Sequence, residues 1–89
     1  MSGINKVVQI KWTKVEEVAT GETFTIQPLL DNVSYIVSES QPEESARGGV
    51  IPKFKQYFYA KGSGDLYLRD FDGVDYRGHN EVYIEKVQE

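Results

Sequence analysis

The chain has 89 residues, no cysteine, and 10 basic against 14 acidic side chains, which gives a net charge of −4. A chain this short builds one thin core, so we expect a single domain over residues 1–89 and no deep catalytic cleft. Disulfide staples and thiolate metal sites are excluded, and the interspersed charges form no basic stripe of the kind that binds nucleic acid.

The N-terminus lacks the apolar core of a secretion signal, and no apolar run reaches the length of a membrane span. We therefore expect synthesis in a reducing cytoplasm, and neither a membrane nor a nucleic acid as a partner. A core this small is marginal, and oligomerisation is one of the usual remedies.

Six segments, taken in chain order, alternate apolar with polar residues, which is the period of a β-strand. In the first segment Val8, Ile10 and Trp12 share one face, and Trp12 is expected as a core residue. The core-facing positions expected in the other five are Phe24 and Ile26, then Val33, Tyr35 and Val37, then Phe54, Phe58 and Ala60, then Leu66 and Leu68, and last Val82 and Ile84.

Short turn signals rich in glycine, aspartate and asparagine separate these segments. Asp72-Gly73 suits a two-residue hairpin turn. The longest interval, Ser38–Gly49, is polar and is expected to be the most mobile loop, with room for one helical turn over 42–46. The pattern predicts an all-β fold, a small antiparallel β-sandwich or barrel of about six to eight short strands with one long polar loop (38–49).

The sequence offers no catalytic set. His79 is the only histidine, and a turn role is favoured over that of a general base because no cysteine, second histidine or activated serine accompanies it. Asp70, Asp72 and Asp75 are weak candidates for a hard cation such as calcium. Their spacing departs from that of the twelve-residue calcium loop, and a hairpin turn is the favoured interpretation. We expect no enzyme activity and no cofactor.

Four tyrosines and an arginine fall opposite the expected core positions of three segments: Tyr57, Tyr59, Tyr67, Arg69 and Tyr83. If the strands at Lys53–Ala60, Asp65–Asp70 and Glu81–Val87 share a sheet, its second face carries all five. Tyrosine and arginine dominate protein–protein hot spots, so this face is the candidate partner-binding site. Two alternatives stay open, namely burial within the sandwich and a carbohydrate platform of stacked rings.

Five segments follow one another in a recognisable order between Trp12 and Arg69: Ala19–Ile26, Tyr35–Pro42, Gly48–Ile51, Phe58–Ala60 and Gly64–Arg69. A strand runs into a proline-containing loop, a glycine-led strand follows, and a G-x-L-Y-x-R hairpin closes the sheet. This order resembles that of the small accessory virion proteins of tailed bacteriophages, of the capsid decoration and head-fibre type.

The resemblance implies a non-enzymatic structural protein of a phage virion, which binds the capsid surface as a decoration or stabilisation subunit. It implies the major capsid protein or another virion protein as partner, a homo-oligomer with a trimer favoured, and location in the virion after synthesis in the bacterial host cytoplasm. Many weak, repeated contacts then add through avidity. Two other hypotheses stay open, a receptor- or carbohydrate-binding module of a tail or head appendage, and a small host-directed inhibitor.

Overall fold

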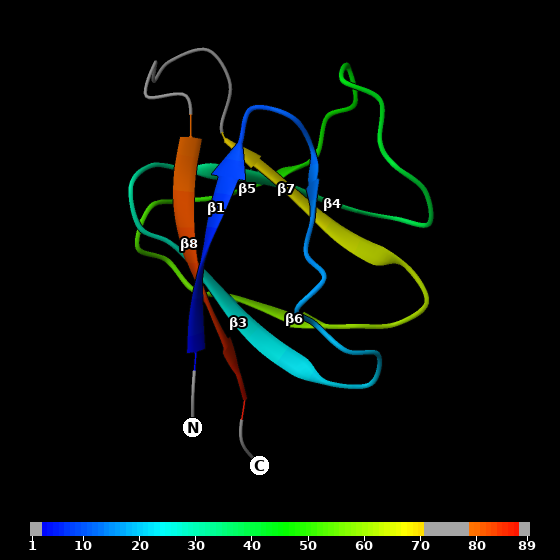
Figure 1. Ribbon diagram of the computed structural model, residues 1–89, viewed down its shortest axis with the longest axis vertical. Helices are drawn as coiled ribbons and strands as arrows, with labels where there is room; N and C mark the ends of the chain where they lie inside the picture. The colour runs from blue at the N-terminus through cyan, green and yellow to red at the C-terminus, as the bar shows by residue number, and fades with distance from the viewer. Residues whose placement is uncertain (1–2, 71–78, 88–89) are drawn as a thin grey trace.

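The computed structural model describes residues 3–70 and 79–87, which form eight β-strands and no helix (Figure 1). The strands are β1 (Gly3–Gln9), β2 (Thr13–Lys14), β3 (Thr23–Pro28), β4 (Val33–Ser38), β5 (Gly49–Ile51), β6 (Tyr57–Ala60), β7 (Asp65–Asp70) and β8 (His79–Lys86). Sheet A has the strand order β1-β8-β3-β6 and sheet B the order β2-β7-β4-β5. Every pairing is antiparallel, so the predicted all-β sandwich of short strands is confirmed.

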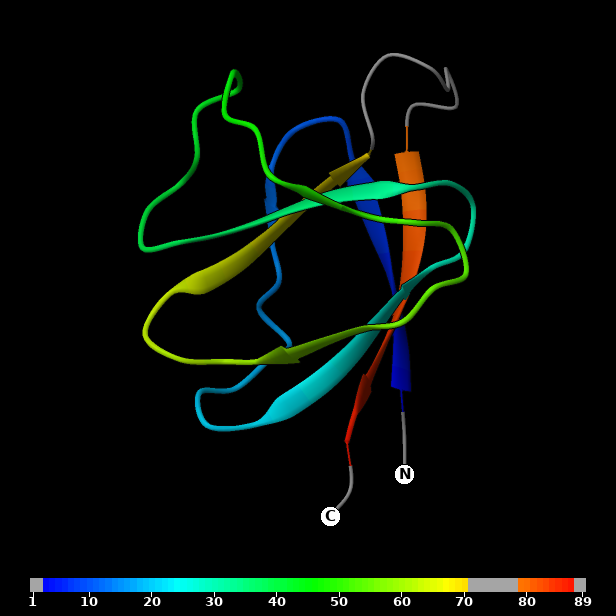
Figure 2. The same ribbon diagram turned by 180° about the vertical axis from the view of Figure 1, so that it is seen from behind.

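The strand pairs follow a simple rule across the two sheets. β1 pairs with β8, β2 with β7, β3 with β6 and β4 with β5, so the first half of the chain pairs with the second half in reverse order. The four strand pairs form one long antiparallel ribbon, which folds over so that β3 also pairs with β8 and β4 with β7. Most connections between consecutive strands therefore cross from one sheet to the other (Figures 1 and 2). The arrangement is that of a jelly roll.

The core lies between the inner faces of the two sheets. Ile26 lies opposite Ile84 in sheet A, Leu66 and Leu68 alternate along β7 in sheet B, and all four are almost completely buried. Burying a side chain of this size stabilises the fold by about 1.5–3 kcal/mol. The buried cluster is completed by Val8, Val15, Val18, Phe24, Val33, Ile51, Tyr59 and Val82.

The sequence predicts the wrong inward face for strand β6. Phe58 and Ala60 are predicted to point inward, but both are exposed, and Tyr57 and Tyr59 pack against the core instead. The cause is the register with β3, which places Tyr59 opposite the buried Phe24 on the same face of the sheet. Both faces of this segment carry aromatic residues, so the periodicity alone does not distinguish the two registers.

Trp12 is buried, but not in the core between the sheets. β1 ends at Gln9, and Ile10, predicted on the core face, is exposed. The chain then enters sheet B at β2, where the Trp12 ring stacks on Arg69, with the guanidinium carbon 4.6 Å from the ring centre. Arg69 alternates with the inward Leu68, so this stack lies on the outer face of sheet B. The single strand predicted to end at Trp12 is therefore two segments in different sheets.

Residues 39–48, here called the strap, are anchored on the outer face of sheet B (the green loop at the upper right of Figure 1). Arg69 Nη1 donates to the carbonyl of Glu44 at 2.8 Å and Nη2 to that of Ala46 at 3.3 Å. Gln41 Nε2 donates to the carbonyl of Trp12 at 3.1 Å. Three hydrogen bonds therefore tie down the loop that the sequence predicts to be the most mobile.

Candidate functional site

The five predicted partner-binding residues lie on three different surfaces. Tyr57 and Tyr59 face the core from sheet A. Tyr67 and Arg69 lie on the outer face of sheet B, where Tyr67 is buried, and Tyr83 is half-buried on the outer face of sheet A. The prediction of one tyrosine face is wrong, because it required β6, β7 and β8 to share a sheet, and β7 belongs to sheet B.

Tyr57 instead pairs with Tyr35 across the gap between the two sheets. Their ring centres are 4.5 Å apart. Burial, and then the neighbouring Tyr35, raises the pKa of Tyr57 from 10.0 to about 12. Gly49 makes room for the pair, because a Cβ there would lie 2.4 Å from the Tyr35 ring. A phenol with so high a pKa keeps its proton at neutral pH, and the pair is a structural contact between the sheets.

The predicted cation ligands are only partly visible. Asp70 is buried, and its Oδ1 accepts a hydrogen bond of 3.0 Å from Asn80 Nδ2. Asp72 and Asp75 lie outside the described residues, as does the hairpin turn predicted at Asp72-Gly73. Within residues 3–70 and 79–87, no three histidine, aspartate or glutamate side chains are placed to hold a metal ion.

Two phenylalanines that the sequence assigns to the core are instead on the surface. Phe54 and Phe58 are 60% and 62% exposed. Phe58 projects from β6, an edge strand of sheet A, and Phe54 lies in the turn that leads into it, at the left of Figure 1. We call Phe54 and Phe58, together with Lys53 and Lys55 of the same turn, the aromatic corner.

The backbone of Phe54 adopts a left-handed conformation, with φ of 68°. This conformation costs a residue other than glycine about 1–3 kcal/mol. Two hydrogen bonds to β3 hold it in place. The Phe54 N–H donates to the Pro28 carbonyl at 2.9 Å, and Gln27 Nε2 donates to the Phe54 carbonyl at 3.0 Å. Glycine or asparagine adopts this conformation more readily, so a phenylalanine here presents an exposed ring at the expense of stability.

A buried polar cluster fixes the position of this turn. The Lys53 N–H donates to Asn32 Oδ1 at 2.8 Å. Asn80 is completely buried, and its Nδ2 donates to the carbonyls of Asp31 and Asn32 at 2.8 and 3.1 Å, and also to Asp70. Because β7, β8 and two turns share this network, both sheets hold the aromatic corner.

The two lysines give the aromatic corner a local positive charge. Lys53 and Lys55 are exposed, and no carboxylate in the described part of the chain lies within ion-pair distance of either. The Lys53 Nζ lies 5.0 Å from the ring centre of Phe54, a contact worth about 0.5–1 kcal/mol. In a chain with a net charge of −4, the corner is a local basic and aromatic surface, complementary to an acidic partner surface.

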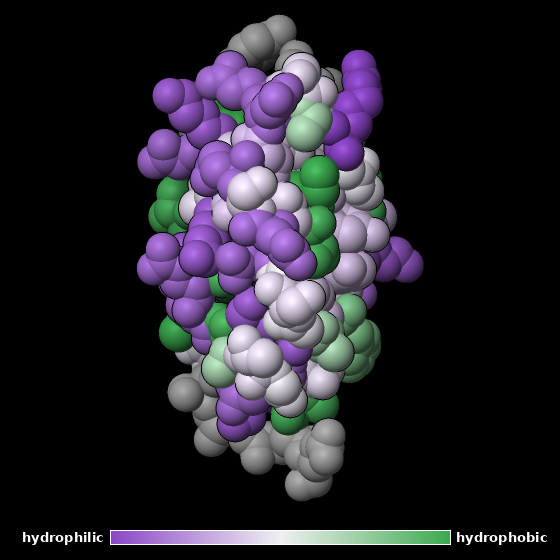
Figure 3. All heavy atoms as spheres, turned by 90° about the vertical axis from the view of Figure 1, so that its right-hand side faces the viewer, coloured by the Kyte–Doolittle hydropathy of each residue, from purple (hydrophilic) through white to green (hydrophobic). Residues whose placement is uncertain are grey.

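The side of the molecule that carries the strap differs from the aromatic corner. Figure 3 looks onto the right-hand side of Figure 1, where the strap lies, and shows mainly hydrophilic residues with isolated hydrophobic ones. The exposed side chains of the strap include Glu39, Glu43, Glu44 and Arg47. The strap contains no aromatic residue, whereas the corner presents two exposed phenylalanine rings.

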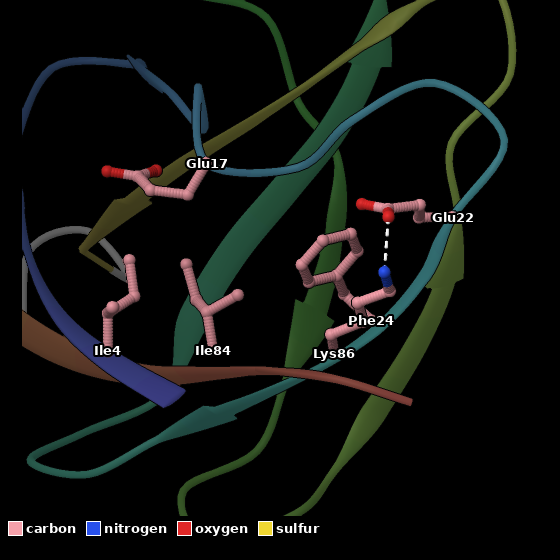
Figure 4. A pocket seen from close by; sticks show the side chains of 6 residues that line it. All are labelled: Ile4, Glu17, Glu22, Phe24, Ile84 and Lys86. Atoms are coloured by element: carbon pink, nitrogen blue, oxygen red, sulfur yellow. Dashed lines mark ion pairs between the residues drawn. The ribbon is translucent and has the colours of Figure 1, made fainter. Parts of the chain in front are cut away.

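A pocket of about 420 Å³ lies between sheet A and residues 15–22, which connect β2 to β3. It is lined by Ile4, Glu17, Glu22, Phe24, Ile84 and Lys86. In Figure 4, the three apolar side chains project from their strands towards the loop that carries the two glutamates. Half of this lining is apolar, and the other half is two glutamates and a lysine.

Sequence reasoning missed the aromatic corner because an exposed phenylalanine has the same period-two position as a buried one. One signal was present in Pro52-Lys53-Phe54-Lys55. A proline followed by a phenylalanine between two lysines fits a solvated turn better than a strand buried on one face.

No protein-family model, curated protein or solved structure matches this chain. Among the described residues there is no helix of the length and hydropathy needed to cross a membrane.

Proposed function

We propose that this protein is a non-enzymatic structural subunit that binds another protein through the aromatic corner. The observation that carries the proposal is the left-handed backbone of Phe54, which two hydrogen bonds to β3 maintain while the ring stays 60% exposed. Strained residues of this kind cluster at binding sites. A turn whose backbone is fixed before binding loses little backbone entropy on association.

We propose a tailed-phage particle as the setting and the major capsid protein or another virion protein as the partner. Two observations support this. The resemblance to decoration and head-fibre proteins runs from Trp12 to Arg69, and the jelly-roll strand order recurs in viral capsid domains. Lys53 and Lys55 steer the corner towards an acidic surface, on which Phe54 and Phe58 supply the apolar contacts.

Mass spectrometry of purified particles of the encoding phage tests the setting, and rebinding of purified protein to stripped particles tests the site. We expect the chain in many copies per particle. Replacing both rings (F54A with F58A) should weaken binding about 100-fold, whereas V7A, which truncates an exposed side chain on the outer face of β1, should leave it unchanged. Absence from the particle overturns the setting, and equal binding by the two variants overturns the site.

A second candidate is a carbohydrate- or receptor-binding module of a phage appendage. The strand order favours it, because lectins also use jelly rolls. Glycan-array binding that F54A with F58A abolishes would select this candidate, and an array without a signal would reject its carbohydrate form.

A further inference from the structure

The pocket of Figure 4 lies over a part of the inner face of sheet A that sheet B does not cover completely. Ile4, Lys6 and Val8 alternate along β1 on this face, because their partners across the ladder are Ile84, Val82 and Asn80. Val8 is completely buried, whereas Ile4 is 40% exposed. Beyond Lys6, Ile4 therefore adds exposed apolar surface to this face, and the pocket lies over it.

The charged side chains at this pocket are already paired. Lys6 Nζ lies 3.1 Å from Glu17 Oε2, and Lys86 pairs with Glu22, as the dashed line in Figure 4 shows. Each pair joins a strand of sheet A to the loop at residues 15–22. A charged ligand would have to compete with one of these pairs, whereas an uncharged group would leave both intact.

The apolar lining has the size and chemistry of a small-molecule site. Ile4, Phe24 and Ile84 come from three adjacent strands, β1, β3 and β8, and project together in Figure 4. The volume of about 420 Å³ falls within the range of about 300–1,000 Å³ that is typical of ligand pockets. Covering the exposed part of Ile4 removes apolar surface from water, which favours binding.

We propose that this pocket binds a small uncharged molecule with an aromatic or branched alkyl group, which covers the exposed side of Ile4 beside the largely buried Phe24 and Ile84 and leaves both lysine–glutamate pairs intact. This site is separate from the aromatic corner and does not rest on the proposed virion role. It adds a ligand-binding function to a domain whose protein-binding surface lies elsewhere.

The test is a titration of the ¹⁵N-labelled protein with indole, followed by the amide shifts in two-dimensional NMR spectra. Indole-3-acetate and tryptamine serve as anionic and cationic relatives of similar size. We expect saturable shifts at Ile4, Phe24 and Ile84, a dissociation constant on the order of 1 mM for indole, and weaker binding of both charged relatives.

Two variants of the same strand complete the test. I4S removes apolar surface from the pocket and should weaken indole binding about three- to tenfold, whereas V7S changes an exposed valine on the opposite face of β1 and should not. I4T replaces I4S if the latter fails to fold, because threonine favours strands. Absence of saturable shifts, equal effects of the Ile4 and Val7 variants, or tighter binding of a charged relative would overturn the proposal.

Discussion

Aromatic residues are buried on the outer face of sheet B and at least partly exposed on the outer face of sheet A. On sheet B, Trp12 and Tyr67 are only 5% and 4% exposed, and the strap is anchored over this face through Arg69. On sheet A, Phe58 projects into solvent beside the strained turn at Phe54. Trp12 and Tyr67, whose rings carry a polar group, are therefore buried. Phe54 and Phe58, whose rings carry none, are exposed.

This contrast shows that residue type does not decide which aromatic groups form a surface. Arg69 donates to two main-chain carbonyls of the strap while its guanidinium stacks on Trp12, so one side chain joins the strap to the Trp12 ring. The strap itself is mostly exposed, with only Pro42 and Ala46 half-buried. In contrast, Phe54 and Phe58 stay exposed in the described part of the chain, which makes the aromatic corner a candidate for binding.

The largest expected effect is the difference between two matched substitutions, Tyr67→Ser and Phe58→Ser. Y67S removes a buried ring and should lower the free energy of unfolding by about 3 kcal/mol. F58S removes an exposed ring and should change it by no more than about 0.5 kcal/mol. Urea unfolding of the two variants measures both values. Similar losses in the two would remove the distinction between the covered and the open face.

Arg69→Ala is expected to lower the free energy of unfolding by about 2 kcal/mol, since it removes two hydrogen bonds to the strap and the stack on Trp12. Trp12 is the only tryptophan in the chain, so its fluorescence reports on the strap directly. Its emission should shift to the red and become accessible to acrylamide. R69K, which keeps the charge but not the forked geometry, should lie between R69A and the parent protein, and unchanged Trp12 emission in R69A would contradict the role given to the strap.

Phe54→Asn should raise the free energy of unfolding by about 0.5–1 kcal/mol, because asparagine tolerates the left-handed backbone that phenylalanine occupies under strain. The same change should abolish partner binding at the corner. F54A is the matched control, since it removes the ring without favouring the conformation. Thermal unfolding of both variants decides the point, and an F54N protein less stable than F54A would show that the turn is not strained.

The last effect appears only at high pH and concerns Tyr57, which faces inward. Burial raises the pKa of Tyr57 in the folded protein from 10.0 to about 12. The stabilising contribution of this neutral phenol is therefore complete below pH 10 and declines as the pH rises towards 12. Unfolding measured at pH 9 to 12 should show a steeper loss for the parent than for Y57F. Tyrosinate absorbance that reaches its full value before pH 11 would contradict the burial of Tyr57.

Much of the fold follows from the sequence, because the periodicity of Val33, Leu66, Leu68, Val82 and Ile84 is unambiguous. Each of these residues occupies the core as predicted, whereas Val37, predicted on the same face as Val33, is 47% exposed. The same rule fails where both faces of a segment are aromatic, as in β6. There the register with β3 decides which face points inward, and register depends on residues far away in the chain.

The candidate site was largely beyond sequence reasoning for a related reason. The left-handed backbone of Phe54 depends on hydrogen bonds from Gln27 and to Pro28, which no local pattern connects to residue 54. Grouping the tyrosines on one face required β7 to join β6 and β8, and the jelly-roll pairing places it in the other sheet. Tertiary pairing, and not local propensity, therefore determines both the backbone conformation of Phe54 and the faces on which the tyrosines lie.

Hydroxyl-radical footprinting of the protein, free and mixed with the phage particle proposed as its partner, tests the central claim most directly. In the free protein, Phe54 and Phe58 should be oxidised rapidly while Trp12, Tyr59 and Tyr67 are protected. On the particle, the two phenylalanines should become protected and the other three should not change. Equal oxidation of Phe54 and Phe58 in the free and bound states would contradict the assignment of the aromatic corner as the binding surface.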